Sequence, residues 1–165
     1  MDLNKVLAMQ YSVENKCTSL FLCDGSCVKV LKKPQEILEC WCLLQGSSVQ
    51  GRVDSFKYVV KAKQKIPVLI SLCGELIFFP LSGVNVEESV WLQYRYIQKV
   101  TSTNTSSCVV HFVGNYQMKL MVGPRVVYRQ IRRCKYFLES LKCHVFSGEI
   151  LLDDVCYNVS GDINE

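Results

Sequence analysis

A short segment near residue 50 brings together residue types that can bind an anion. It contains Gly46, Ser47 and Ser48, followed after two residues by Gly51 and Arg52. A serine hydroxyl at a helix start accepts hydrogen bonds from the first-turn amides, and those amides with the helix dipole attract negative charge. A glycine in the first turn lets another backbone come close. The spacing predicts a helix start that binds a phosphate group.

Basic residues follow this segment and extend its positive charge. From residue 52 to residue 65 there are five bases and one acid, Asp54. The bases are Arg52, Lys57, Lys61, Lys63 and Lys65. Such an excess of cations is typical of a surface that binds nucleic acid. Arg52 also suits an internal ion pair with Asp54 or Glu39, because arginine is the preferred partner in partly buried pairs.

A second basic segment begins at Pro124, a residue that suits the first position of a helix. At about 3.6 residues per turn, its apolar residues form one stripe. They are Val127, Ile131, Cys134, Leu138 and Leu141. The opposite side carries Arg125, Arg129, Arg132 and Tyr136. We expect these arginines, together with Arg133, to contact a DNA groove or its phosphates, since narrow A/T-rich grooves attract arginine.

Charge divides the chain into two parts. The net charge of the 165 residues is +4, while residues 147–165 contain five acids and no base, so residues 1–146 carry +4 − (−5) = +9. A basic body with an acidic tail is a pattern of proteins that bind polyanions. We expect a single DNA-binding domain over residues 1–146 and an acidic tail over 147–165. The tail either competes with DNA for the basic surface or is simply solvated.

Several classes of protein are disfavoured. Ten cysteines are spread through apolar segments without metal-ligand spacing, so we expect small buried hydrophobes in a reducing, cytoplasmic compartment, with no metal and no cofactor. The sequence has no phosphate loop and no grouping typical of a catalytic triad, so it does not indicate an enzyme. No apolar run approaches the roughly 18 residues of a membrane helix, and the start does not resemble a signal peptide.

Short apolar runs separated by turn residues predict a sheet that is mainly antiparallel. Strands are expected over residues 6–13, 18–23, 27–31, 67–71, 76–79, 90–100, 108–113 and 117–122. Pro80 is expected to end the strand before it, because proline cannot donate to a sheet. Residues 101–107, rich in Thr, Ser and Asn, are expected to form a polar loop.

Three helices complete an α+β fold. They are expected over residues 34–44, 48–61 and 124–142. In the second, Val49, Val53 and Phe56 are spaced for one helix face. Residues 55–63 also alternate as a strand would, but the serines at the start favour the helix.

Several pieces of the sequence, taken in order, resemble one known family. They are Gly46-Ser47-Ser48-x-x-Gly51-Arg52, Lys65-x-Pro67, Phe78-Phe79-Pro80, Trp91 and Val127-Tyr128-Arg129, with Pro34 and Ile37 upstream. Over roughly residues 17–142, the chain resembles the ComK-type competence transcription factors. The short amino terminus and the acidic tail depart from the family's pattern.

The resemblance implies a sequence-specific transcription activator of genes for DNA uptake. It implies binding to paired A/T-rich boxes in the minor groove of double-stranded promoter DNA. It also implies a homo-dimer or higher oligomer, since two half-sites need two copies, and a proteolytic adaptor as a further partner.

We therefore expect a DNA-binding activator whose basic helix faces contact DNA. The candidate DNA-binding residues are Ser47, Ser48, Gly51, Arg52, Lys57, Lys61, Lys63, Lys65, Arg125, Arg129, Arg132 and Arg133. The alternative is a protein-interaction or adaptor module whose basic face binds an acidic protein partner.

Overall fold

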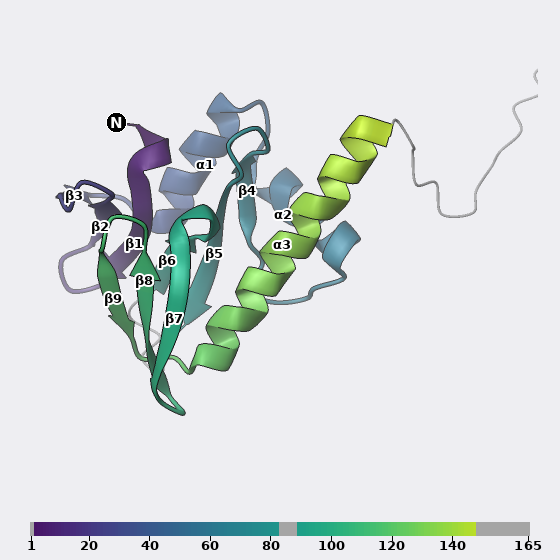
Figure 1. Cartoon of the computed structure of the whole chain (residues 1–165). Coiled ribbons are helices and arrows are strands. Elements are labelled where there is room, and N and C mark those ends of the chain that lie inside the picture. Colours follow the sequence, from purple (N-terminus) through teal and green to yellow (C-terminus); the bar gives the residue numbers. More distant parts are fainter. Residues whose placement is uncertain (1, 83–88, 148–165) are drawn as a thin grey trace, which may run out of the picture.

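The computed structural model describes residues 2–82 and 89–147. In this part of the chain, nine strands form two antiparallel sheets and three α-helices pack on them (Figure 1). The strands are β1 (Val6–Ser12), β2 (Cys17–Leu22), β3 (Cys27–Val30), β4 (Val68–Ser71), β5 (Leu76–Ser82), β6 (Ser89–Gln93), β7 (Ile97–Asn104), β8 (Ser107–Phe112) and β9 (Gln117–Leu120). The helices are α1 (Pro34–Leu44), α2 (Val49–Val60) and α3 (Pro124–Ser147). The expected α+β fold with a mainly antiparallel sheet is confirmed.

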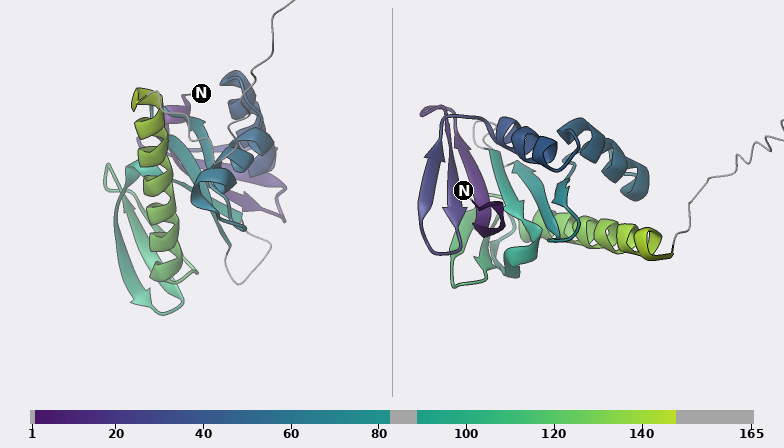
Figure 2. Two further views of the ribbon diagram at one scale, coloured as in Figure 1. Left: turned by 90° about the vertical axis from the view of Figure 1, so that its right-hand side faces the viewer. Right: turned by 90° about the horizontal axis from the view of Figure 1, so that it is seen from above.

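The larger sheet is buried on both of its faces. Its strand order is β3-β2-β1-β6-β5-β4, and the smaller sheet has the order β7-β8-β9. Because strand residues alternate between faces, Leu76 and Phe78 of β5 join one apolar core while Ile77 and Phe79 join the other. The first core lies under α1, and the second lies between the large sheet, the small sheet and α3 (Figure 2).

Helix α1 covers the first face because its apolar residues recur on one side. Ile37, Leu38 and Trp41 are buried against the sheet, and the Trp41 ring centroid lies 5.6 Å from that of Phe78. Burying each such side chain contributes about 1.5–3 kcal/mol. Gly46 then adopts a φ of 73°, which glycine accepts easily, and this turn leads directly into α2.

Helix α2 runs past the β4 edge of the large sheet and reaches both cores. Val49 and Val53 pack against the first core, whereas Phe56 is fully buried in the second. The Phe56 ring centroid lies 4.7 Å from that of Phe137 in α3. The spacing of four and three residues between these side chains explains why a helix forms here. The alternative of a strand over residues 55–63 is wrong.

Pro80 does not end the strand before it, so that prediction is wrong. Strand β5 continues through Pro80, which is paired with Trp91 of β6, to residue 82. The pairing of β5 with β4 already ends at Phe78, opposite Val68. Pro80 therefore has a strand neighbour on only one side, and its missing N–H costs the sheet no β4 bond.

The region from residue 90 to residue 107 also differs from expectation. The strand expected over 90–100 is divided, because β6 belongs to the large sheet, Tyr94–Tyr96 form a 3-10 turn, and β7 belongs to the small sheet. The expected polar loop over 101–107 is instead a β-hairpin in which β7 runs to Asn104. Its β-branched threonines favour a strand, and pairing with β8 outweighs their polarity.

The tip of this hairpin packs directly on the residue before α3. A Cβ atom added to Gly123 would overlap the carbonyl oxygen of Thr105. Helix α3 then extends from Pro124 to Ser147, five residues beyond the expected end at residue 142. Gly123 thus lets the hairpin and the helix start touch through backbone atoms.

We expect Gly123→Ala to lower the free energy of unfolding by about 1–3 kcal/mol, because the new methyl group forces the hairpin away from the helix. Urea denaturation measures the change. Gly74→Ala is the matched control, since the nearest atoms to its Cβ would lie at 3.6 and 3.9 Å and it should change stability by less than about 0.5 kcal/mol. Equal stability of the two variants would contradict the contact.

Candidate nucleic-acid interface

The buried stripe of α3 determines which side chains face outward. Val127, Cys134, Phe137 and Leu138 lie in the second core. Arg125, Arg129, Arg132 and Tyr136, which the sequence places on the opposite side, are exposed. The predicted orientation of these basic side chains, away from the core, is therefore confirmed. We call Arg125, Arg129 and Arg132 the arginine row.

The arginine row has no acidic partner in the described part of the chain. No carboxylate there lies within ion-pair distance of its three guanidinium groups. The lysines farther along α3 differ, since Lys135 lies 3.9 Å from Glu139 and Lys142 pairs with Glu75. The amino-terminal half of α3 thus keeps uncompensated charge, while the carboxyl-terminal half is partly neutralised.

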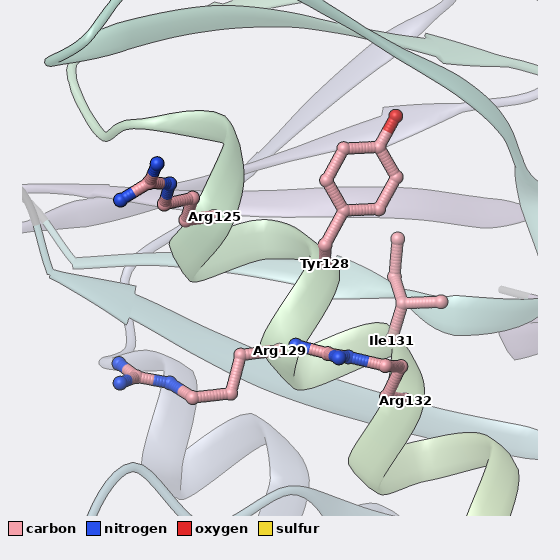
Figure 3. A pocket seen from close by; sticks show the side chains of 5 residues that line it. All are labelled: Arg125, Tyr128, Arg129, Ile131 and Arg132. Carbon is pink, nitrogen blue, oxygen red and sulfur yellow. The ribbon is translucent and has the colours of Figure 1, made fainter.

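A shallow hollow of about 610 Å³ lies along the arginine row. It is lined by Arg125, Tyr128, Arg129, Ile131 and Arg132 (Figure 3). The Tyr128 hydroxyl donates a hydrogen bond of 3.0 Å to the Val100 carbonyl of β7, which holds the ring in place. An aromatic ring beside free guanidinium groups can contact sugars or phosphates of a nucleic acid. We call this site the arginine hollow.

The two basic segments meet where the chain after α2 crosses α3. The Gln130 amide nitrogen donates to the carbonyls of Lys65 at 2.8 Å and Pro80 at 3.1 Å, and Gln130 is only 1% exposed. Beside it, Arg133 donates to the Gln64 carbonyl at 3.3 Å. Lys63 is exposed on this crossing segment, and Lys65 is half-buried. Cations from both segments therefore lie on adjoining surface.

The two lysines within and at the end of α2 are exposed as well. Lys61 ends the helix with a left-handed φ of 56°, and its N–H donates to the Lys57 carbonyl at 2.9 Å. Its ammonium lies 4.7 Å from the centroid of the Tyr58 ring. Neither lysine has a carboxylate within ion-pair distance among the described residues.

The start of α2 is capped as expected, but the anion bound there is a carboxylate of the protein itself. The Ser48 hydroxyl accepts from the Gly51 amide at 3.1 Å, so the predicted cap is confirmed. The Val49 amide donates at 2.9 Å to the carboxylate of Glu39 from α1. Half-buried Ser47 directs its hydroxyl to the Ser48 carbonyl at 3.4 Å. A side-chain carboxylate thus takes the place where the sequence indicated phosphate.

Arg52 turns inward rather than toward solvent. It donates to the Gln45 carbonyl at the end of α1 at 3.2 Å, and its Nε atom is buried without a hydrogen-bond partner in the described structure. No ion pair with Asp54 or Glu39 forms among the described residues. Burial raises the pKa of nearby Cys42, and the positive charge of Arg52 opposes that rise. Arg52 therefore ties α2 to α1.

The expectation of buried cysteines is only partly right. Of the nine described cysteines, all free thiols, Cys17, Cys42, Cys108 and Cys134 are buried. Desolvation by burial strongly raises the pKa of the Cys134 thiol, which keeps it neutral. The exposed cysteines are Cys27, Cys40, Cys73 and Cys143. Within residues 2–82 and 89–147, no cluster of His, Cys, Asp or Glu suits a metal ion.

Sequence reasoning missed the β7–β8 hairpin as part of this surface. Its exposed residues from Thr101 to Ser106 are uncharged, so the distribution of charged residues in the sequence does not indicate them. The signal available in the sequence is the alternation of Thr101 and Thr103, which favours a strand. Arg125 lines a second hollow together with this hairpin.

Comparison with known proteins identifies the family. A family model described as ComK protein matches residues 5–144, so the chain belongs to the ComK family. The Competence transcription factor of Bacillus subtilis (strain 168) is 20% identical over 128 residues, which cover 78% of this chain and 67% of that protein. No solved structure is significantly similar to the chain. Family and relative together support a competence transcription factor.

None of the described helices has both the length and the apolar character that crossing a membrane would require.

We expect Gln130→Met to lower the free energy of unfolding by about 1–3 kcal/mol, because the carbonyls of Lys65 and Pro80 lose their donor. The crossing segment should also become more accessible, which the rate of tryptic cleavage after Lys63 measures. Gln98→Met, at an exposed position of β7, is the control and should change neither quantity. Unchanged stability and cleavage in the Gln130 variant would show that the amide does not hold the segment.

Proposed function

We propose that this ComK-family chain is a transcription activator of competence genes that binds A/T-rich double-stranded DNA. The arginine row of α3 is the centre of the binding surface. The observation that carries the proposal is that three exposed arginines stand together without an acidic partner in the described structure. A surface facing only water normally mixes charges of both signs.

The proposed surface extends from the arginine row to the end of α2. Arg133 adjoins the row, and the lysines of the second segment supply further positive charge. These lysines are Lys57, Lys61, Lys63 and Lys65. Four residues expected from the sequence to bind DNA are not part of the proposed surface. Their polar atoms form hydrogen bonds at the corner between α1 and α2, or they belong to the amino-terminal cap of α2. They are Ser47, Ser48, Gly51 and Arg52.

The arginine row is proposed to lie along the minor groove and to contact the phosphates that border it, since a narrow A/T-rich groove concentrates the negative potential that attracts arginine. The domain proposed for this activity is residues 1–146, acting as a homo-dimer or higher oligomer on paired boxes. The acidic tail expected over 147–165 lies, beyond Ser147, outside the described residues. Contact with a proteolytic adaptor stays a prediction.

Replacing Arg129 and Arg132 together by alanine should weaken binding to an A/T-rich duplex by about ten-fold or more, because hydrogen bonds to charged groups are lost. The slope of log affinity against log salt should fall by about 1.8, or 0.9 for each lost phosphate contact. A fluorescence titration across a salt series measures both values.

Sedimentation of the complex gives the number of chains per duplex, which should be two or more.

The matched control removes two exposed lysines at the other edge of the large sheet, Lys29 of β3 and Lys32 just after it. Strand β3 lies away from α3 in Figure 1. This variant has the same net charge and should keep nearly full affinity. Equal losses in both variants would attribute binding to net charge alone. No binding by the unmodified protein at ~50 mM salt, where even non-specific binding is strong, would favour the acidic-protein partner.

The choice of groove has its own test. Inosine–cytosine pairs present the minor groove without the guanine amino group, so they imitate A·T pairs there while altering the major groove. A duplex in which I·C replaces A·T within the boxes should bind within about two-fold of the original. A G·C duplex should lose about ten-fold or more, at about 1–3 kcal/mol for each mismatched pair. Loss of binding on the I·C duplex would place the protein in the major groove.

A further inference from the structure

A second hollow lies between the tip of the β7–β8 hairpin and the start of α3. It has a volume of about 290 Å³. Its lining residues are Ser102, Asn104, Thr105, Pro124 and Arg125. We call this site the hairpin hollow. Arg125 also lines the arginine hollow, so the two hollows adjoin along one side of the molecule.

The tip is held in one shape by its own hydrogen bonds. The Asn104 side-chain oxygen accepts from the Ser106 amide at 2.8 Å and from the Ser106 hydroxyl at 3.0 Å. The Ser102 hydroxyl donates to the Asn104 carbonyl at 3.3 Å. Contact between Thr105 and Gly123 fixes the tip against the helix start. The polar groups of the hollow are therefore positioned before any ligand arrives, which lowers the cost of binding.

The two sides of the hairpin differ. Val100 is buried, and alternation along β7 places Ser102 and Asn104 on the side of α3, where they line the hollow. Thr101 faces the other way, since its hydroxyl lies 2.8 Å from His111 on the outer face of the small sheet. Thr103 lies where the register of β7 shifts, between Ser102 and Asn104, and it does not line the hollow. The Thr105 hydroxyl has no hydrogen-bond partner within residues 2–82 and 89–147.

The chemistry of the hairpin hollow suits a phosphate diester. One guanidinium group supplies charge, and neutral hydroxyl and amide groups supply hydrogen bonds. Among the described residues, no carboxylate lines the hollow. Contacts from arginine, serine, threonine and asparagine to phosphate oxygens are the commonest contacts that position proteins on DNA.

We propose that the hairpin hollow binds one backbone phosphate of the DNA strand whose neighbouring phosphates contact the arginine row. This proposal rests on the proposed function and names a part of the surface that charge alone does not indicate. Arg125 stands at the border of the two hollows and contacts this phosphate from the helix side. The hairpin tip contacts it from the sheet side, so the strand lies between helix and hairpin.

Because the polar groups of the hairpin tip are uncharged, removing one of them should change DNA affinity without changing its salt dependence. Thr105→Val removes one hydroxyl, keeps the shape of the side chain and breaks no hydrogen bond within the described structure. It should weaken DNA binding about ten-fold or more, as expected for one hydrogen bond to a charged phosphate oxygen. The salt slope should stay unchanged, because no cation is removed and no fewer counterions are released. Thr103→Val makes the same change at a hairpin residue that does not line the hollow and should leave affinity unchanged.

The bound phosphate is located by a scan with single neutral methylphosphonate groups along the duplex. At one position, the substitution should weaken binding of the unmodified protein but have a smaller effect on the Thr105→Val variant. Thermal unfolding of each variant checks that the fold is kept.

The outcomes of these experiments separate the two proposals. Equal affinity of the Thr105→Val and unmodified proteins, or an equal loss with Thr103→Val, overturns the hairpin hollow while binding through the arginine row stands. A reduced salt slope with Thr105→Val would also overturn it, since the threonine would then act by displacing Arg125. Absence of any DNA binding by the unmodified protein overturns the proposed function itself.

Discussion

The buried apolar stripe of α3, together with the buried amide of Gln130, sets the rotation of the helix about its own axis, and the rest of the basic surface depends on that rotation. Its nitrogen joins α3 to the carbonyls of Lys65 and Pro80, which come from two different parts of the chain. Its oxygen is buried without a partner among the described residues, which costs free energy. An apolar side chain would pack here without that cost but would leave the carbonyls of Lys65 and Pro80 without their donor. With successive helical residues about 100° apart, a shift by one residue would turn the arginine row toward the body.

Both halves of α3 carry basic residues, but they differ in whether those residues form ion pairs. Lys135 and Lys142 have acidic partners, and the arginine row has none in the described structure. Since exposed ion pairs contribute only about 0–1 kcal/mol to stability, their larger effect here is to cancel charge on the second half of the helix. The unpaired positive charge of α3 therefore lies in its first half, where two hollows share Arg125.

Local sequence patterns predicted most helices and strands, whereas contacts between distant residues determine which side chains are available to bind DNA. The helices follow from stripes of apolar residues, and the Ser48 cap follows from its type and place. The role of Glu39 was not predictable, because its carboxylate reaches the Val49 amide only through the corner between α1 and α2. The same corner turns Arg52 inward. The sequence also could not reveal that Val6 and Met9 share one core, since a bulge in β1 changes the alternation between them.

Helix α2 belongs to both cores at once, through Val53 on one side and Phe56 on the other. These shared contacts couple the two layers, so we expect the described body to unfold in a single cooperative transition. Ligand that binds only the native state then stabilises the entire body by mass action, whichever layer it touches. DNA held at α3 would thereby slow hydrogen exchange at distant amides that open only when the whole body unfolds, such as those of the central strand β1. Binding at this surface could then be detected far from it.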